Sequence, residues 1–292
     1  MRTLGFIGLG MMGSAMALRA VQMGMIVYGY NRTREKVQHL KDRIRLVSSI
    51  SELCEKSEAI IIMVSDDQAD EDVTVGNRGL FESVKSGKIV IDSSTISPSL
   101  SKRLTEKLRR KGAIRIEMPV MGGPQDALRG ELVAIVGAER TRYEELLKLI
   151  RIFATRIFYA GNIGSALTIK LALNFITAAY AEAIAEGISF VRRSGSDPLL
   201  LVQILNTTKY KTPFSQTKGI KMVQGSFEPT FYLRHMVKDL SIAEKTAQEN
   251  MAFTPVLSVL KEVYKGAHNL GLGELDYSAV AEFLAKLNPS KR

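Results

Sequence analysis

The stretch GFIGLGMMGSAMA, residues 5–17, decides the fold of the first half of this chain. Gly8, Gly10 and Gly13 fall where an apolar strand turns into a helix. At such a turn the first glycine permits a tight bend, the second lets the backbone approach a pyrophosphate, and the third allows close packing of helix on strand. A glycine-rich turn can be purely structural, but its position at a helix N-terminus predicts a dinucleotide-binding site. The residues that this stretch assigns to the cofactor are Gly8, Leu9, Gly10, Met11, Met12 and Gly13.

The end of the second predicted strand indicates which dinucleotide is bound. A site that prefers NAD usually places a carboxylate here, where it binds the ribose 2′-hydroxyl. This chain instead has Asn31, Arg32 and Thr33, and guanidinium and hydroxyl groups suit a 2′-phosphate. The alternative is an exposed basic turn without a ligand. We therefore predict NADP as the cofactor, with NAD as a weaker one, and we add Val64 and Ser65 after a later strand to the site.

Short β-branched runs and amphipathic stretches alternate over the first half of the chain. Alternation of this kind predicts a parallel sheet with helices on both faces. The predicted strands cover residues 3–10, 25–30, 58–64, 88–94, 113–120 and 132–137, and the predicted helices cover residues 11–24, 97–112 and 139–154.

The second half of the chain has a helical pattern. A long helix reaches Arg193 with Gly195 as its C-terminal cap, and Asp197 before a proline begins the next helix. The predicted fold class is therefore α/β, with an N-terminal Rossmann-type dinucleotide-binding domain over residues 1–161. A long connecting helix then opens an all-α substrate and oligomerisation domain over residues 162–292.

Composition narrows the class of protein. The chain has 292 residues, of which 46% are hydrophobic and 24% charged, as in ordinary globular proteins. Its single cysteine, Cys54, cannot form an intrachain disulfide, which favours a reducing, cytoplasmic location. Arg2 before an apolar run is also typical of a signal peptide, but the glycine spacing favours the strand–turn–helix. Polar residues interrupt the apolar stretches, so no membrane span is expected.

The formal net charge of +10 raises the question of a polyanionic partner. The densest basic group, residues 102–111, lies along one predicted helix and is expected to form its solvated face. Zinc-finger spacing, a basic zipper and an aromatic-interleaved basic strand are all absent from the sequence, so no specific nucleic-acid partner is expected. No metal site is expected either, because His39, His235 and His268 are scattered without ligand spacing.

Lys170 and Asn174 stand out in the apolar helix ALTIKLALNFITAAYAEAIAEG, residues 166–187. Positions four apart share a helix face, so the two polar side chains are neighbours. Burial of an ammonium group is unfavourable, and a lysine in such a helix commonly extends its amine to water. The other interpretation is that a functional site requires this amine.

Two further stretches carry groups suited to a site. Gly122 and Gly123 in EMPVMGGPQDALRG follow a strand and could present backbone amides to a carboxylate, although a simple turn also explains them. Lys238 beside Asp239 in HMVKDLSIAEK is typical of a surface charge pair.

Five motifs, taken in order, resemble the 3-hydroxyisobutyrate dehydrogenase family, the β-hydroxyacid dehydrogenases. They are GFIGLGMMGSAMA, IDSSTISP, EMPVMGGPQDALRG, GNIGSALTIKLALN and HMVKDLSIA, and the resemblance covers nearly all of the chain. It implies hydride transfer between the nicotinamide and the carbon that bears the substrate hydroxyl, without a metal. It also implies a homodimer or homotetramer that acts on a small carboxylate substrate.

The resemblance also implies roles for individual residues. Lys170 is similar to the catalytic lysine, which exchanges the hydroxyl proton, and Asn174 is similar to its substrate-binding neighbour. Thr95 is similar to the threonine beside the nicotinamide, and Lys238 to the cofactor-side lysine. Where the family usually has serine before the glycine pair, this chain has Met121, so a substrate-binding hydroxyl is missing. The substrate-binding residues implied in this way are Met121, Gly122, Gly123, Lys170 and Asn174.

The sequence leaves the substrate open. Interconversion of 3-hydroxyisobutyrate, L-serine or another short β-hydroxyacid with its carbonyl product is the first interpretation. NADPH-dependent reduction of glyoxylate or succinic semialdehyde is the second. A non-catalytic nucleotide-binding protein of the same fold is the non-enzymatic alternative, which Lys170 and Asn174 disfavour.

Overall fold

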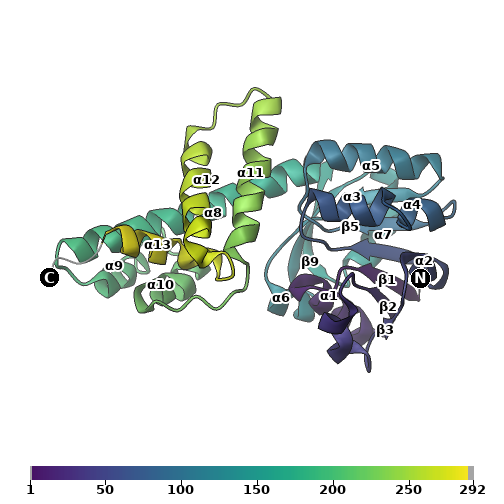
Figure 1. Ribbon diagram of the computed structural model, residues 1–292, viewed down its shortest axis with the longest axis horizontal. Coiled ribbons are helices and arrows are strands. Elements are labelled where there is room, and N and C mark those ends of the chain that lie inside the picture. Colours follow the sequence, from purple (N-terminus) through teal and green to yellow (C-terminus); the bar gives the residue numbers. More distant parts are fainter. Residues whose placement is uncertain (1, 289–292) are drawn as a thin grey trace. The chain divides into compact units, whose positions relative to one another are not determined.

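The computed structural model describes residues 2–288 and contains two compact units, which divide between Lys170 and Leu171 inside helix α8 (Ser165–Arg193) (Figure 1). The first turn of α8 belongs to the N-terminal unit because Leu167 is buried in a cluster with side chains of that unit. The boundary predicted from the sequence lies between residues 161 and 162, before α8 begins. The division into a cofactor-binding domain and a substrate domain stays a prediction.

A nine-stranded sheet forms the centre of the N-terminal unit, within the residues that the structure describes. Its strands follow the order β3-β2-β1-β4-β5-β6-β8-β7, and β9 also pairs with β8. The strands are β1 (Thr3–Ile7), β2 (Ile26–Tyr30), β3 (Arg45–Leu46), β4 (Ala59–Ile62), β5 (Ile89–Asp92), β6 (Ile114–Glu117), β7 (Val120–Met121), β8 (Leu132–Gly137) and β9 (Ala154–Gly161). The helices of this unit are α1 (Met11–Gln22), η1 (Arg34–Leu40), α2 (Ile50–Lys56), α3 (Asp67–Val75), α4 (Leu80–Ser83), α5 (Pro98–Arg110), α6 (Pro124–Arg129) and α7 (Arg140–Ile150).

The sheet is parallel from β3 to β6, which confirms the fold class predicted from the alternation of strands and helices. β8 runs antiparallel to β6 and β7, so the sheet is mixed at this end. Helices cover both faces, because neighbouring side chains of β4 belong to different clusters. Ile61 packs with Met16 of α1, whereas Ile60 and Ile62 pack with Leu53 of α2.

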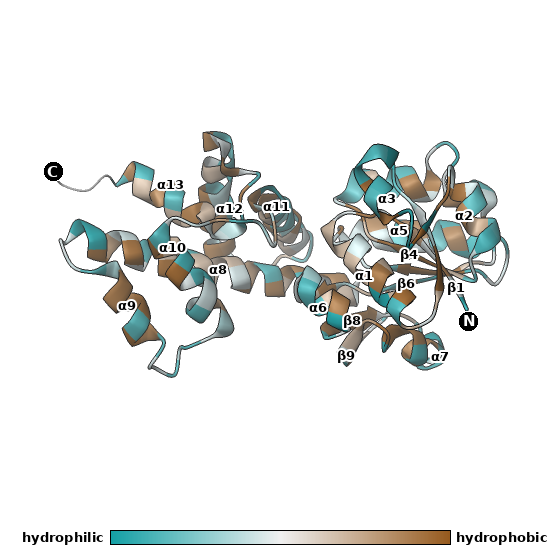
Figure 2. Cartoon of the chain, turned by 90° about the horizontal axis from the view of Figure 1, so that it is seen from below, coloured by the Kyte–Doolittle hydropathy of each residue, from teal (hydrophilic) through white to brown (hydrophobic). Residues whose placement is uncertain are grey.

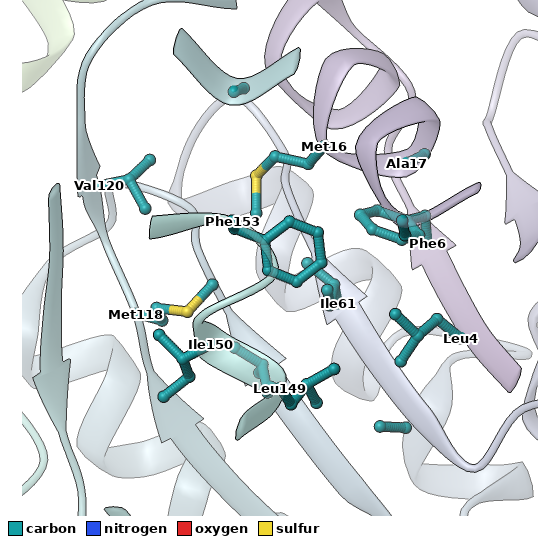
Figure 3. Packing of buried hydrophobic residues seen from close by; sticks show 14 of the residues in the cluster. Leu4, Phe6, Met16, Ala17, Ile61, Met118, Val120, Leu149, Ile150 and Phe153 are labelled. Atoms are coloured by element: carbon teal, nitrogen blue, oxygen red, sulfur yellow. The ribbon is translucent and has the colours of Figure 1, made fainter. Parts of the chain in front are cut away.

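The larger of these clusters forms the main core of the N-terminal unit. Figure 3 shows Leu4 and Phe6 of β1, Ile61 of β4 and Met16 of α1 among the side chains of this core. Phe6 meets Phe153 edge to face, with ring centroids 6.3 Å apart. Figure 2 shows the strands as predominantly apolar and the covering helices with hydrophilic residues as well, as expected for a sheet buried between two helical layers.

The structure differs from the predicted elements after residue 139. α7 ends at Ile150, and the residues predicted as its last turn lead into β9, which the sequence analysis did not predict. β9 lacks a clean alternation of buried and exposed positions, and its Phe158 is 58% exposed. The period-two signal that identifies a strand is therefore weak here.

The C-terminal unit is helical, as predicted. Its elements after α8 are α9 (Pro198–Leu205), η2 (Ser215–Gly219), α10 (Ile220–Gln224), α11 (Leu233–Glu249), α12 (Pro255–Ala267), η3 (His268–Leu272), η4 (Tyr277–Ala279) and α13 (Val280–Leu287). Gly195 has a φ of +77° after α8, and the side chain of Asp197 accepts a hydrogen bond from the Leu199 N–H at the start of α9. Both predicted helix caps are thus confirmed.

Helix α8 is long and apolar enough to cross a membrane by length and composition alone. This finding differs from the expectation that its polar residues interrupt it too often. Its buried positions, such as Ala181 and Ile188, pack with Leu240 of α11 and Leu260 of α12 in the core of the C-terminal unit. This core accounts for the buried apolar positions of α8, whereas Ile176 and Phe190 of the same helix are exposed.

Candidate active site

The turn after β1 leaves part of its backbone open for a ligand. Gly8 has a φ of +91°, and a Cβ there would lie 2.2 Å from the carbonyl oxygen of Met63. A Cβ on Gly13 would lie 2.0 Å from the carbonyl oxygen of Gly8, so both glycines are required by packing. At Gly10, by contrast, no described atom beyond its chain neighbours lies within 4 Å of a Cβ position. Gly10 caps α1, whose first turn has no acidic residue, so the residues present fit a pyrophosphate.

The end of β2 is fixed to this turn by Asn31. Its Oδ1 accepts a hydrogen bond from the Leu9 N–H at 3.0 Å, and its Nδ2 donates to the carbonyl oxygen of Thr33 at 2.8 Å. The Asn31 amide therefore holds the glycine turn and the residues after β2 together. Arg32 and Thr33 are exposed beside it and supply the groups suited to a 2′-phosphate.

The loops after β4 and β5 lie at the same edge of the sheet, since β1, β4 and β5 are parallel neighbours. The Val64 N–H donates to Oγ of Ser94 at 3.0 Å and joins the two loops. Ser65 is exposed and Thr95 is half-buried. Ligands of open α/β sheets bind outside the carboxyl ends of the strands, so these predicted cofactor residues lie where a dinucleotide would bind.

The glycine pair follows β7 and begins α6. Gly122 has a φ of +119°, a conformation that favours glycine. The Gly123 N–H donates to Oδ2 of Asp126 at 2.8 Å. A substrate carboxylate would therefore compete with Asp126 for the Gly123 amide, a feature that the sequence analysis did not anticipate.

Lys170 lies at the end of the N-terminal unit and is 9% exposed. Its Nζ is 3.1 Å from Sδ of Met121, the residue before the glycine pair. This burial favours a use for the amine within the fold over a lysine that extends its amine to water. The fold thus brings the candidate proton-transfer group to the candidate carboxylate-binding loop.

In the C-terminal unit, Asn174 and Lys238 contact the same carboxylate, that of Asp239, for which the sequence predicted no role in the site. Nδ2 of Asn174 donates to Oδ2 of Asp239 at 2.6 Å, and Nζ of Lys238 lies 2.6 Å from Oδ1 of the same carboxylate. Asp239 is 1% exposed, so the Lys238–Asp239 pair is not a surface charge pair. The adjacent lysine and aspartate are visible in the sequence, but the burial of the aspartate depends on how α8 and α11 pack within this unit.

The predicted residues therefore form two groups, each within one unit. The N-terminal group contains the glycine turn, the loops after β2, β4 and β5, and the Met121–Lys170 contact. The C-terminal group contains Asn174 and Lys238. Among residues 2–288, no three His, Cys, Asp or Glu side chains are grouped so that they could hold a metal ion.

Two known protein families match the chain. Residues 3–161 match the NAD binding domain of 6-phosphogluconate dehydrogenase, and residues 164–284 match the NAD-binding region of NADP-dependent 3-hydroxyisobutyrate dehydrogenase. Both descriptions name binding of a nicotinamide dinucleotide. They confirm the cofactor class predicted from the glycine turn.

Individual proteins match nearly the whole chain. Glyoxylate/succinic semialdehyde reductase 1 of Arabidopsis thaliana is 33% identical over 280 residues, which cover 96% of this chain and 97% of the relative. The chloroplastic glyoxylate/succinic semialdehyde reductase 2 of the same plant is 30% identical, and the match covers 97% of this chain and 79% of the relative. A solved structure of Psf3 in complex with NADP+ and 2-OPP has a TM-score of 0.88 at 25% identity, covering 96% of this chain and 99% of that one. The chain therefore belongs to the 3-hydroxyisobutyrate dehydrogenase family of NAD(P)-dependent β-hydroxyacid dehydrogenases.

Proposed function

We propose that the protein is an NADP(H)-dependent oxidoreductase that interconverts a short hydroxyl-bearing carboxylate and its carbonyl partner. The bound dinucleotide supplies or accepts the hydride. Lys170 exchanges a proton with the substrate oxygen. The observation that carries this proposal is the buried Lys170 amine, 3.1 Å from Met121 and next to the glycine pair.

The surroundings of Lys170 suit proton exchange. A thioether sulfur is a weak acceptor, so the Met121 contact stabilises an ammonium group less than a hydroxyl or carboxylate would. In its neutral form the amine can accept the hydroxyl proton during oxidation, and in its protonated form it can return the proton during reduction.

The substrate carboxylate is proposed to bind at the glycine pair, and the family resemblance assigns Asn174 to the substrate as well. Because Met121 offers no hydroxyl, main-chain N–H groups of the glycine pair are proposed to bind the carboxylate, and the Gly123 N–H can do so only if it exchanges its bond to Asp126. Asn174 follows Lys170 by one turn of α8, and its amide is held by Asp239. Lys238, held by the same carboxylate, is proposed to contact the cofactor.

The relatives favour reduction as the first reaction to test. Two plant proteins that match over nearly the whole chain are named for reduction of glyoxylate and succinic semialdehyde. Both compounds are short carboxylates with an aldehyde, which agrees with a carboxylate-binding loop beside a proton donor. Oxidation of 3-hydroxyisobutyrate is the second candidate, because the family model that matches residues 164–284 is named for that dehydrogenase. L-serine is tested with it as another short β-hydroxyacid.

An initial-rate comparison tests the function. The purified protein is assayed with glyoxylate and succinic semialdehyde against NADPH and NADH, and with 3-hydroxyisobutyrate and L-serine against NADP and NAD. We expect turnover of at least one substrate, with the phosphorylated cofactor preferred. Binding of NADPH without turnover of any substrate would instead favour the non-catalytic nucleotide-binding protein.

We further propose that the protein assembles as a homodimer or homotetramer in the cytoplasm. The proposal rests on the family resemblance and on the single cysteine, Cys54, which is buried. Light scattering of the purified chain tests the assembly, and fractionation of cells that express it tests the location.

A further inference from the structure

Glu117 is a buried carboxyl that the proposed mechanism does not use. It ends β6, is 0% exposed, and lies four residues before Met121. Opposite it, Gly137 of β8 leaves the space that the carboxyl fills, since a Cβ on Gly137 would lie 2.5 Å from Oε2 of Glu117. Burial of a carboxyl is unfavourable unless hydrogen bonds compensate it, so its partners indicate what the fold gains from it.

Oε1 of Glu117 accepts two hydrogen bonds. The hydroxyl of Ser101 on α5 donates at 2.5 Å, and the Gly164 N–H donates at 2.7 Å. Gly164 directly precedes α8 and has a φ of +98°, a conformation that favours glycine. Glu117 therefore fixes the turn from which the lysine-bearing helix begins.

This contact connects the two segments that meet at Met121 and Lys170. Lys170 follows Gly164 by less than two turns of helix, or about 9 Å of rise. Met121 follows Glu117 along the strand segment that ends in β7. A shift of the Gly164 turn would therefore move the lysine relative to the sulfur that lies 3.1 Å from its amine.

The same hydrogen-bond network reaches the cofactor edge of the sheet. Nη1 of Arg115 donates to Oγ of Ser101 at 2.7 Å, and Arg115 also forms a buried ion pair with Asp92. Oδ1 of Asp92 accepts from the Ser94 N–H at 2.8 Å, and Oγ of Ser94 accepts from the Val64 N–H at 3.0 Å. A continuous series of contacts thus runs from the turn before α8 to the loop after β4, entirely inside the N-terminal unit.

We propose that Glu117 is a positioning residue, whose Oε1 holds Gly164 and thereby sets the place of the Lys170 amine against Met121 and the substrate. This inference deepens the proposed function and rests on Lys170 as the proton-transfer group. Glu117 itself touches neither substrate nor cofactor in this role. The contact requires an acceptor oxygen rather than a negative charge. Burial raises the pKa of Glu117, and the neutral acid keeps its carbonyl acceptor.

The test compares two substitutions of nearly equal size. Glu117→Met keeps the length of the side chain and removes the acceptor, whereas Glu117→Gln keeps an acceptor oxygen. For Glu117→Met we expect kcat to fall about tenfold or more, because a displaced proton-transfer group loses its alignment. The Kd for NADPH, measured by nicotinamide fluorescence, should stay within about threefold of the unmodified value, since the glycine turn is untouched and the Arg115–Asp92–Ser94 contacts that reach the Val64 loop remain. Glu117→Gln should keep both quantities within about threefold.

A third substitution and a stability measurement separate positioning from folding. Ser101→Ala removes the other hydrogen bond of Glu117 and leaves the Gly164 contact, so kcat should stay within about threefold. Glu117→Met leaves the Ser101 hydroxyl and the Gly164 N–H without this acceptor, so it should lower the melting temperature. Thermal unfolding followed by circular dichroism shows whether the variant is still folded at the temperature of the assay.

Three results would overturn the proposal. They are a Glu117→Met protein that keeps more than half of the unmodified kcat, an equal loss of kcat and NADPH affinity, and a Glu117→Gln protein as impaired as Glu117→Met. If Glu117→Met does not fold, hydrogen exchange of the unmodified protein tests the Glu117–Gly164 contact instead. Exchange of the Gly164 amide as slow as that of core amides of β5 supports the proposal. Exchange at the rate of an exposed turn overturns it. An unmodified protein without turnover would contradict the proposed function, whereas hydrogen exchange would still test the Glu117–Gly164 contact.

Discussion

The amine of Lys170 lies 3.1 Å from the sulfur of Met121, although 49 positions separate the two residues in the chain. A family serine would place a hydroxyl at this position and could share a strong hydrogen bond with the amine or the substrate. The thioether offers a weak acceptor and an apolar surface instead. Both side chains of this pair can therefore be tested separately, the amine for proton transfer and the sulfur for substrate choice.

Lys170→Met should abolish most turnover without loss of cofactor binding. The substitution keeps an apolar side chain in α8 and removes the amine. We expect kcat to fall by ~100-fold or more, the usual scale for loss of a positioned acid or base. Lys107→Met is the matched control, because Lys107 is an exposed lysine on α5 and its loss should leave kcat unchanged. If Lys170→Met keeps more than half of the unmodified kcat with the best substrate, Lys170 is not the proton-transfer group.

Met121→Ser should change the ranking of substrates. A hydroxyl beside the glycine pair adds one hydrogen bond to some substrates, worth about 1 kcal/mol, or a several-fold change in relative kcat/KM. Met121→Leu serves as the control, since it keeps an apolar side chain and should preserve the ranking. The measurement is kcat/KM for glyoxylate, succinic semialdehyde and 3-hydroxyisobutyrate with each variant. An identical ranking in all three proteins would show that position 121 does not contact the substrate.

Arg32→Asp should reverse or erase the preference for NADP. The exposed guanidinium after β2 favours a 2′-phosphate, whereas a carboxylate repels it and binds a ribose hydroxyl. We expect the unmodified protein to favour NADP in kcat/KM by at least about tenfold, or ~1.4 kcal/mol. Arg34→Asp makes the same charge change two residues later, at the start of η1, and should keep most of the preference. Equal use of NAD and NADP by the unmodified protein would contradict this prediction.

The features that could be predicted from the sequence are those set by local backbone requirements. Gly8 and Gly13 stand where any side chain would meet a carbonyl oxygen, so their spacing alone identified the turn between β1 and α1. The caps at Gly195 and Asp197 were predictable for the same reason, since each satisfies backbone groups of its own helix end. Strand β9 was missed because it alternates poorly between buried and exposed positions.

The features that could not be predicted depend on contacts between distant segments. Asn31 could be placed at the end of a strand, but only the fold shows that its amide binds the Leu9 N–H. The sequence predicted a surface pair for Lys238 and Asp239, because adjacent opposite charges on a helix are usually exposed. The burial of Asp239 against Asn174 depends on packing between segments 65 positions apart, which the sequence pattern does not show. The partners of Glu117 lie on α5 and before α8, and no periodic pattern links those segments.

Glu182 should make the stability of the C-terminal unit depend on pH. It lies on α8, is 6% exposed, and within the described residues neither of its carboxyl oxygens has a hydrogen-bond partner. Burial, with a smaller contribution from Glu186, raises the pKa of Glu182 to about 7. In the unfolded chain the carboxyl would lose its proton near its ordinary pKa of 4.5. Between these two pH values the folded protein binds more protons than the unfolded chain, so the free energy of unfolding falls as pH rises.

The free energy of unfolding should fall by about 3 kcal/mol in total, because each unit of pKa shift corresponds to ~1.4 kcal/mol. The fall is complete above pH 7. Glu182→Gln replaces the carboxyl with a neutral amide of similar shape, so it should flatten the pH dependence and raise stability mainly at pH 8. Glu186→Gln, on the exposed side of the same helix, is the control and should keep most of the slope, since burial is the larger cause of the shift. Urea unfolding of the three proteins at pH 5, 6, 7 and 8, followed by circular dichroism, measures the difference. Equal slopes for Glu182→Gln and the unmodified protein would show that Glu182 does not titrate in this range.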